Sequence, residues 1–210
     1  MNNCKKTRGL VLSEALMSIA ILAISITIMG SIITSAISMT TLSKNLMIAQ
    51  GLATEGIEIV KSIRNTNWLK QPTDPNCWLR PDPIDGSTSP CATPSTGSSY
   101  NIVKSDSGFE LVAHATELDV ESKLGNLNDL AMYQLMIEEV TANQDATYKF
   151  ERYIHDENET NPDLQTSFYR SIKFDHYGVN DAVITVRVEW LEGSKVRTLE
   201  RTYKLYNYLD

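Results

Sequence analysis

Hydrophobic residues follow three different patterns along this chain, and each pattern predicts a different element. From Leu10 to Ser43 apolar and small side chains are almost continuous, and Glu14 is the only charged residue. From Lys44 to Trp68 apolar residues recur every three or four positions, which is the period of an amphipathic helix. From Tyr100 onward they alternate with polar residues, which is the period of β-strands. The chain should therefore form one long helix followed by a sheet.

The alternating region predicts seven strands. Glu192-Gly193-Ser194 supplies turn residues before the last strand, so the last two strands should form an antiparallel hairpin. The expected strands are Tyr100–Lys104, Phe109–Ala115, Met132–Glu138, Tyr148–Ile154, Phe168–Phe174, Val183–Trp190 and Arg197–Tyr206. The predicted fold class is α+β: a long N-terminal helix, half transmembrane and half amphipathic, packed on a C-terminal antiparallel β-sheet head.

The apolar run is longer than the roughly 20 residues that a membrane-spanning helix needs. Lys5, Lys6 and Arg8 precede it and an acidic region follows it, so the positive-inside rule predicts a cytoplasmic N-terminus and an extracytoplasmic C-terminal part. Two alternatives stay open: an uncleaved signal anchor, and a secretory signal that is cut after Ser38.

The net charge and a search for catalytic motifs exclude several classes of function. The chain has 26 acidic and 19 basic residues and a formal net charge of −7, which argues against a broad basic surface for nucleic acid, although a local basic patch remains compatible. No hydrolase, nucleotide-binding or zinc motif is present. His114, His155 and His176 are scattered over different predicted elements. We therefore expect no enzymatic activity and no cofactor.

Two acidic stretches invite a binding interpretation that their spacing does not favour. Asp156 lies two residues before the sequon Asn158-Glu159-Thr160, which makes Asn158 a candidate glycosylation site, but a solvated turn is the favoured interpretation. Asp175, Asn180 and Asp181 lack the oxygen spacing of a defined calcium loop. We therefore predict no metal site.

Residues 69–99 read as a surface loop, because this stretch contains six of the seven prolines. Cys77 and Cys91 lie 14 residues apart within it, and in an extracytoplasmic loop they are consistent with a disulfide worth about 3 kcal/mol. Reduced thiols are the alternative. Trp78 in the same loop makes an adhesive role conceivable, although no residue demonstrates it.

The carboxylate of Glu14 is the anomaly of the apolar run. A charge five residues into a charge-free span costs a few kcal/mol unless it is paired. Glu14 either lies at headgroup depth and stays hydrated, or it pairs with a cation at equal depth. Cleavage of the chain after Gly9 would create such a cation, because it would leave an α-amino group on Leu10.

A short basic leader that ends in Gly9, an apolar Leu10, Glu14 and a following aliphatic run resemble the class III signal of type IV prepilins and pseudopilins. The resemblance implies that a prepilin peptidase cuts after Gly9 and methylates Leu10, and that Glu14 contacts the N-terminal amine of a neighbouring subunit during filament assembly. The sequence departs from the family pattern in having leucine rather than phenylalanine at position 10, and in having no proline within the span.

The stretch from Ala49 to Trp68 also resembles minor pilins and minor pseudopilins. Glu55 and Glu58 in this stretch read as a solvated face, with an intersubunit contact as the alternative. The resemblance implies a leader (1–9) and a filament-core role for the transmembrane helix (10–43). The residue patterns predict that helix, an amphipathic half (44–68), a loop (69–99) and a β-rich head (100–210).

The partners implied are other pilin subunits, both major and minor, the prepilin peptidase, the inner-membrane assembly platform and, before assembly, the lipid bilayer. The implied location is the cytoplasmic membrane, crossed once, and then an extracellular or periplasmic filament. A surface pilus, a type II secretion pseudopilus and a DNA-uptake filament share these features. The alternative function is a monomeric membrane-anchored extracytoplasmic binding module.

Overall fold

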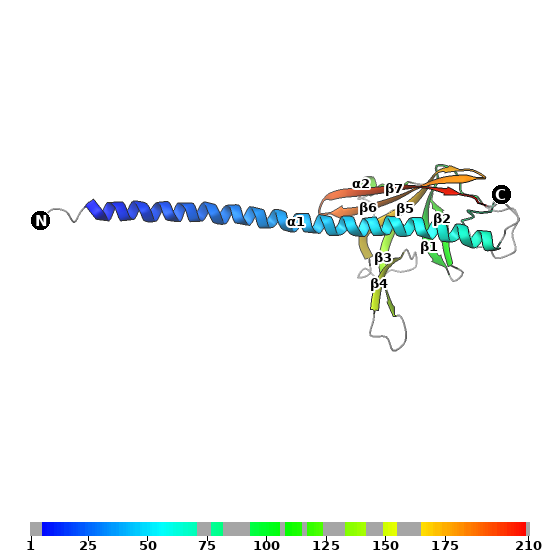
Figure 1. The fold of residues 1–210 in the computed structure, drawn as a ribbon, viewed down its shortest axis with the longest axis horizontal. Coiled ribbons are helices and arrows are strands. Elements are labelled where there is room, and N and C mark those ends of the chain that lie inside the picture. The colour runs from blue at the N-terminus through cyan, green and yellow to red at the C-terminus, as the bar shows by residue number, and fades with distance from the viewer. Residues whose placement is uncertain are drawn as a thin grey trace. The chain divides into compact units, whose positions relative to one another are not determined.

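A computed structural model describes residues 6–70, 77–81, 93–105, 108–114, 117–123, 133–141, 149–154 and 165–208. The chain divides into two compact units, Met1–Asn45 and Leu46–Asp210. The second unit contains the C-terminal half of the long helix and the whole sheet (Figure 1).

The long helix α1 runs from Lys6 to Lys70. Its sequence is rich in Leu, Ile, Met and Ala, and the first proline of the chain, Pro72, follows two residues after its end. Lys70 places a positive charge in the last turn, where the helix dipole favours it. The predicted long helix is confirmed.

All the predicted strands are confirmed, with ends that differ by up to three residues. The described residues form one antiparallel sheet of seven strands. These are β1 (Ser99–Ser105), β2 (Gly108–His114), β3 (Gln134–Thr141), β4 (Lys149–Ile154), β5 (Gln165–Tyr177), β6 (Asp181–Glu192) and β7 (Lys195–Tyr206). The antiparallel sheet that the alternating pattern predicts is therefore present.

Strand β5 is the centre of the sheet. One edge of β5 pairs with β6 from Phe168 to Tyr177. The other edge is shared, because β3 pairs near Tyr169 and β1 pairs near Ile172. The hairpin partners β2 and β4 extend the two branches, and β7 pairs with β6. The strand order is thus β2-β1-β5-β3-β4 along one path, with β6 and β7 on the other side of β5.

The C-terminal half of α1 packs on one face of this sheet. Alternate side chains of β6, from Ala182 to Trp190, are buried on that face. Gly56 of α1 makes a close approach, since a Cβ atom there would lie 3.0 Å from Cγ1 of Val186. The helix contributes Ala49, Leu52, Ala53, Ile57, Ile59, Val60 and Ile63 to the shared core. The amphipathic period predicted for this half is confirmed.

A smaller cluster covers part of the opposite face. The short helix α2 (Val120–Lys123), which the sequence analysis did not predict, follows Leu118 there. Leu118 and Val120 are fully buried against Tyr133 and Tyr169. The sheet is therefore covered on both faces at this position.

The prediction of a surface loop is wrong for residues 77–81. Cys77, Trp78 and Leu79 are all at most 1% exposed. The Trp78 ring stacks on Tyr177 with centroids 5.9 Å apart, and the buried Asn67 amide donates a hydrogen bond to the carbonyl oxygen of Arg80 at 3.2 Å. These contacts pull the segment into the core, so Trp78 is not presented to a partner.

Candidate functional site

The N-terminal half of α1 carries a large apolar surface that nothing in the described structure covers. The helix is long and apolar enough to cross a membrane, by length and composition. Its leucine, isoleucine and methionine side chains between Leu12 and Met39 are 54–70% exposed. Soluble proteins rarely leave so long an apolar surface in water. This surface therefore requires lipid or other protein around it.

The serine and threonine hydroxyls on this apolar surface already form hydrogen bonds within the helix. Ser18 donates to the carbonyl oxygen of Glu14 at 2.9 Å, and Thr34 donates in the same way to Gly30 at 2.9 Å. Ser25, Thr27, Ser31, Thr40 and Thr41 also bond to carbonyls three or four residues earlier. Hydroxyls satisfied within their own helix are compatible with an apolar medium.

The predicted processing and assembly residues lie close together near the start of α1. Gly9 and Leu10 are both helical, and Glu14 lies one turn after Leu10. Glu14 is exposed, and the next charged residue along α1 is Lys44. The structure therefore places a lone carboxylate at one end of a long uncharged surface.

Glu55 joins α1 to the sheet instead of lying on a purely solvated face. Its carboxylate pairs at 3.3 Å with the guanidinium of Arg170, whose side chain is 4% exposed. Arg170 also donates to the carbonyl oxygen of Leu52 at 3.3 Å. Burial lowers the pKa of Arg170, while Glu55 opposes that change. Glu58 keeps the predicted solvated position, 61% exposed and paired with Lys61 at 2.7 Å.

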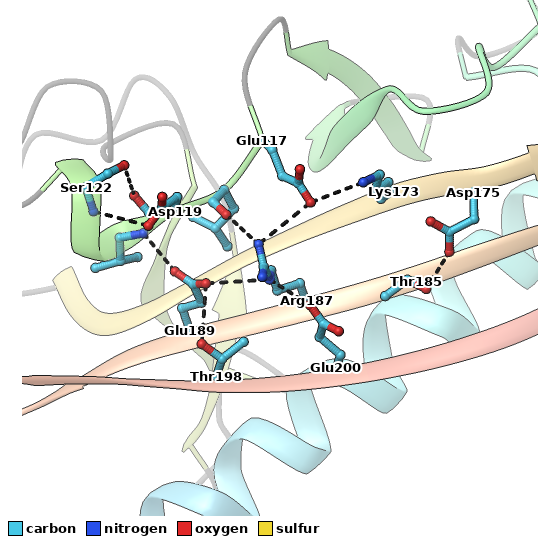
Figure 2. A network of polar contacts seen from close by, with 12 residues as sticks. Glu117, Asp119, Ser122, Lys173, Asp175, Thr185, Arg187, Glu189, Thr198 and Glu200 are labelled. Carbon is cyan, nitrogen blue, oxygen red and sulfur yellow. Dashed lines mark hydrogen bonds and ion pairs between the residues drawn. The ribbon is translucent and has the colours of Figure 1, made fainter.

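A polar network covers the sheet face that points away from α1 (Figure 2). Arg187 of β6 lies at its centre, pairing with Glu200 of β7 at 2.8 Å and donating to the carbonyl oxygen of Leu118 at 2.9 Å. Its guanidinium also lies 3.7 Å from Glu117, which pairs with Lys173 of β5 at 3.3 Å. The network therefore fixes the segment that leads into α2 onto three strands.

Glu189 is the buried carboxylate of this network. It accepts a hydrogen bond from the backbone N–H of Val120 at 2.8 Å and another from Thr198 at 3.4 Å. Burial nevertheless raises the pKa of Glu189 above its ordinary value. The pKa of the nearby Asp119 is lowered, because the backbone N–H and hydroxyl of Ser122 stabilise its charged form. The arrangement is that of a structural ion network.

The remaining candidates divide between described and undescribed residues. Cys77 is disulfide-bonded, but its predicted partner Cys91 and the sequon residue Asn158 lie outside the described residues. Asp181 pairs with Lys204 at 2.8 Å and Asp175 accepts a hydrogen bond from Thr185 at 2.6 Å. Over the residues that the structure describes, no three His, Cys, Asp or Glu side chains form a group that could hold a metal ion.

Arg170 and Arg187 are the important residues that the sequence analysis missed. Arg170 shares the buried parity of Phe168, Ile172 and Phe174, so its position in the alternating pattern already signalled a core-facing charge. Arg187 gave no such signal, because its partners Glu117 and Leu118 come from a distant segment.

Comparisons with protein-family models, with curated proteins and with solved structures gave no match to this chain.

Proposed function

We propose that this protein is a structural subunit of a type IV pilus-like filament, a minor pilin or pseudopilin. In this proposal a prepilin peptidase removes residues 1–9, and Leu10 becomes the methylated first residue. The observation that carries the proposal is the uncovered apolar stretch of α1 between Leu12 and Met39, with Glu14 as its single charge.

The apolar half of α1 has two surroundings in this account. Before assembly, lipid covers it and the head lies outside the cytoplasmic membrane. After extraction by the assembly platform, the same helices of neighbouring subunits cover it in the filament core. Hydroxyls that are already bonded within the helix suit both surroundings, because neither lipid nor packed helices supply water.

Glu14 would select and position the incoming subunit. A carboxylate in an apolar medium gains most from a partner of opposite charge at the same depth. The α-amino group that cleavage creates on Leu10 is such a partner when it belongs to a neighbouring subunit. The pair would set the axial register, while the apolar side chains of Leu12–Met39 supply the packing area.

The test compares Glu14→Ala with the matched control Glu58→Ala, which removes an exposed carboxylate from the same helix outside the apolar stretch. We expect normal cleavage and membrane insertion of Glu14→Ala. Its recovery in sheared filaments should fall roughly tenfold, because the variant cannot pair with the amine of the incoming subunit. A tenfold change corresponds to about 1.4 kcal/mol of lost pairing free energy. The Glu58→Ala subunit should assemble normally.

Three readouts separate the steps: the N-terminal peptide mass reports cleavage, membrane fractionation reports insertion, and immunodetection of sheared filaments reports incorporation. Incorporation of the Glu14→Ala subunit at the wild-type level would contradict the assembly role of this carboxylate. Loss of cleavage in that variant would place Glu14 in peptidase recognition instead.

A further inference from the structure

Strand β7 is an edge strand that lacks most of the usual protection against pairing with another chain. Among the described residues it pairs with β6 only. It is 12 residues long, contains no proline, and keeps a continuous register from Lys195 to Tyr206 without a bulge. Natural edge strands are usually short, bulged, covered or interrupted by proline. β7 relies on charge instead.

The hairpin geometry decides which backbone groups of β7 point outward. A two-residue loop, Gly193-Ser194, joins the paired residues Glu192 and Lys195. Such a loop is closed by a hydrogen-bonded pair, and bonded and non-bonded pairs alternate along an antiparallel ladder. The N–H and C=O groups of Thr198, Glu200 and Thr202 therefore point away from β6, toward the free edge.

The side chains of β7 place a row of cations on the face toward α1. Lys61 of α1 lies 4.3 Å above the ring of Tyr203, and Leu205 is buried opposite Ala182, so odd-numbered residues face the helix. This face carries Lys195, Arg197 and Arg201, with Leu199 between them. Arg197 also pairs with Glu192 at 2.8 Å.

The charge of β7 contrasts with that of the chain. The strand has four basic residues and one acidic residue, a formal charge of +3, in a chain whose formal net charge is −7. Like charges that face each other across two strands are destabilising, whereas opposite charges are favourable. The edge therefore disfavours a second β7 and favours an acidic strand.

We propose that the free edge of β7 binds an extended, acidic peptide segment of another protein by strand addition. Backbone hydrogen bonds to the outward amides and carbonyls would supply affinity, and alternate side chains would supply specificity. Carboxylates on the segment would face Lys195, Arg197 and Arg201, and an apolar residue would face Leu199. The inference uses the head sheet alone and does not depend on the filament assignment.

This register defines a probe. In an antiparallel addition, a peptide with the sequence Glu-Thr-Val-Thr-Glu-Thr-Glu places its first glutamate opposite Arg201, its valine opposite Leu199, and its last two glutamates opposite Arg197 and Lys195. Two control peptides isolate the components. One replaces each glutamate by lysine, and the other is N-methylated on alternate residues, which blocks the backbone ladder but keeps the charge.

The experiment measures fluorescence anisotropy of the labelled peptide with the full chain in non-ionic detergent at low salt. We expect the glutamate peptide to bind and both control peptides to bind at least about tenfold more weakly. Arg201→Glu should weaken binding of the glutamate peptide by a similar factor. The matched control Lys149→Glu reverses a charge on β4, which lies on the other side of β5 from β6 and β7, and should keep wild-type binding.

Amide hydrogen exchange of the complex gives a second, independent readout. Bound glutamate peptide should slow exchange at the outward amides of Thr198, Glu200 and Thr202. Equal binding of the N-methylated peptide, equal binding of the lysine peptide, or unchanged exchange at these amides would each overturn the proposal. Dimerisation of the chain through β7, abolished by Arg201→Glu, would show that a second copy is the occupant and would overturn it as well.

Discussion

Three charged residues of this protein, Glu14, Arg170 and Glu189, lie in three different environments. Glu14 lies on an apolar helix surface and is the only charged residue between Arg8 and Lys44. Arg170 is buried in the core and is partnered by Glu55 at its edge. Glu189 is buried on the other sheet face and receives hydrogen bonds from Val120 and Thr198. Each charge is tolerated only where a partner is present or can be supplied.

Glu14 could be singled out from the sequence, whereas the environments of Arg170 and Glu189 could not, for a physical reason. A single carboxylate in a run of apolar residues is visible without any structure. The alternating pattern marks Arg170 as inward-facing, but it does not reveal Glu55 as its partner on α1. The environment of Glu189 depends on Val120, which is 69 positions away in the chain, and contacts at that separation leave no local pattern.

The raised pKa of Glu189 makes a prediction about pH. When the pKa of a carboxylate is higher in the folded state than in the unfolded state, ionising that carboxylate destabilises the folded state. The contribution of Glu189 to the free energy of unfolding therefore falls as the pH rises above the ordinary pKa of a glutamate. Glu189→Gln lacks this cost. The free energy of unfolding of this variant, relative to wild type, should therefore increase between pH 4 and pH 7.

Urea unfolding of the full chain in non-ionic detergent at the two pH values measures this difference. Glu121→Gln, which removes an exposed carboxylate of α2, corrects for the change in net charge. A relative free energy of unfolding that stays flat or decreases with pH would mean that hydrogen bonds and Arg187 outweigh burial at Glu189.

At the scale of elements, the periodicity of the chain predicted most of the structure. Each of the seven strands was located, because the period of two persists through each of them. The errors concern elements that periodicity does not encode. α2 is four residues long and shows no period. Residues 77–81 contain a proline and a cysteine, yet the stacking of Trp78 on Tyr177 buries them.

Two glycines of α1 provide a test of how this helix packs on the sheet. A Cβ atom at Gly51 would meet open space, whereas one at Gly56 would lie 3.0 Å from Val186 and 3.5 Å from Arg170. Glycine-to-alanine replacement in a helix gains up to about 1 kcal/mol. Gly51→Ala should therefore stabilise the folded chain by up to about that amount. Gly56→Ala should be destabilising, because crowding in a packed core costs about 1–3 kcal/mol.

Urea unfolding of the two variants in the same detergent measures the contrast, and each variant serves as the control for the other. Both substitutions add the same methyl group to the same helix. Equal stabilisation by both would show that α1 does not lie against β6 as closely as the 3.0 Å approach requires.

The whole molecule combines two surfaces of opposite character. The first unit presents an uncovered apolar helix, and the second unit presents an acidic head with its own core. This division was predictable from the sequence, because the nearly uncharged stretch from Leu10 to Ser43 is followed by an acidic, polar region.

The central claim is that the apolar helix is a processed assembly element, and the N-terminus of the native protein tests it most directly. The measurement is the intact mass and the N-terminal peptide mass of the protein recovered from the envelope of its own cells, with methylation resolved. The account predicts a chain that begins at N-methylated Leu10. A chain that begins at Met1 would contradict it and favour a membrane-anchored binding module, and one that begins after Ser38 would contradict it in favour of ordinary secretion.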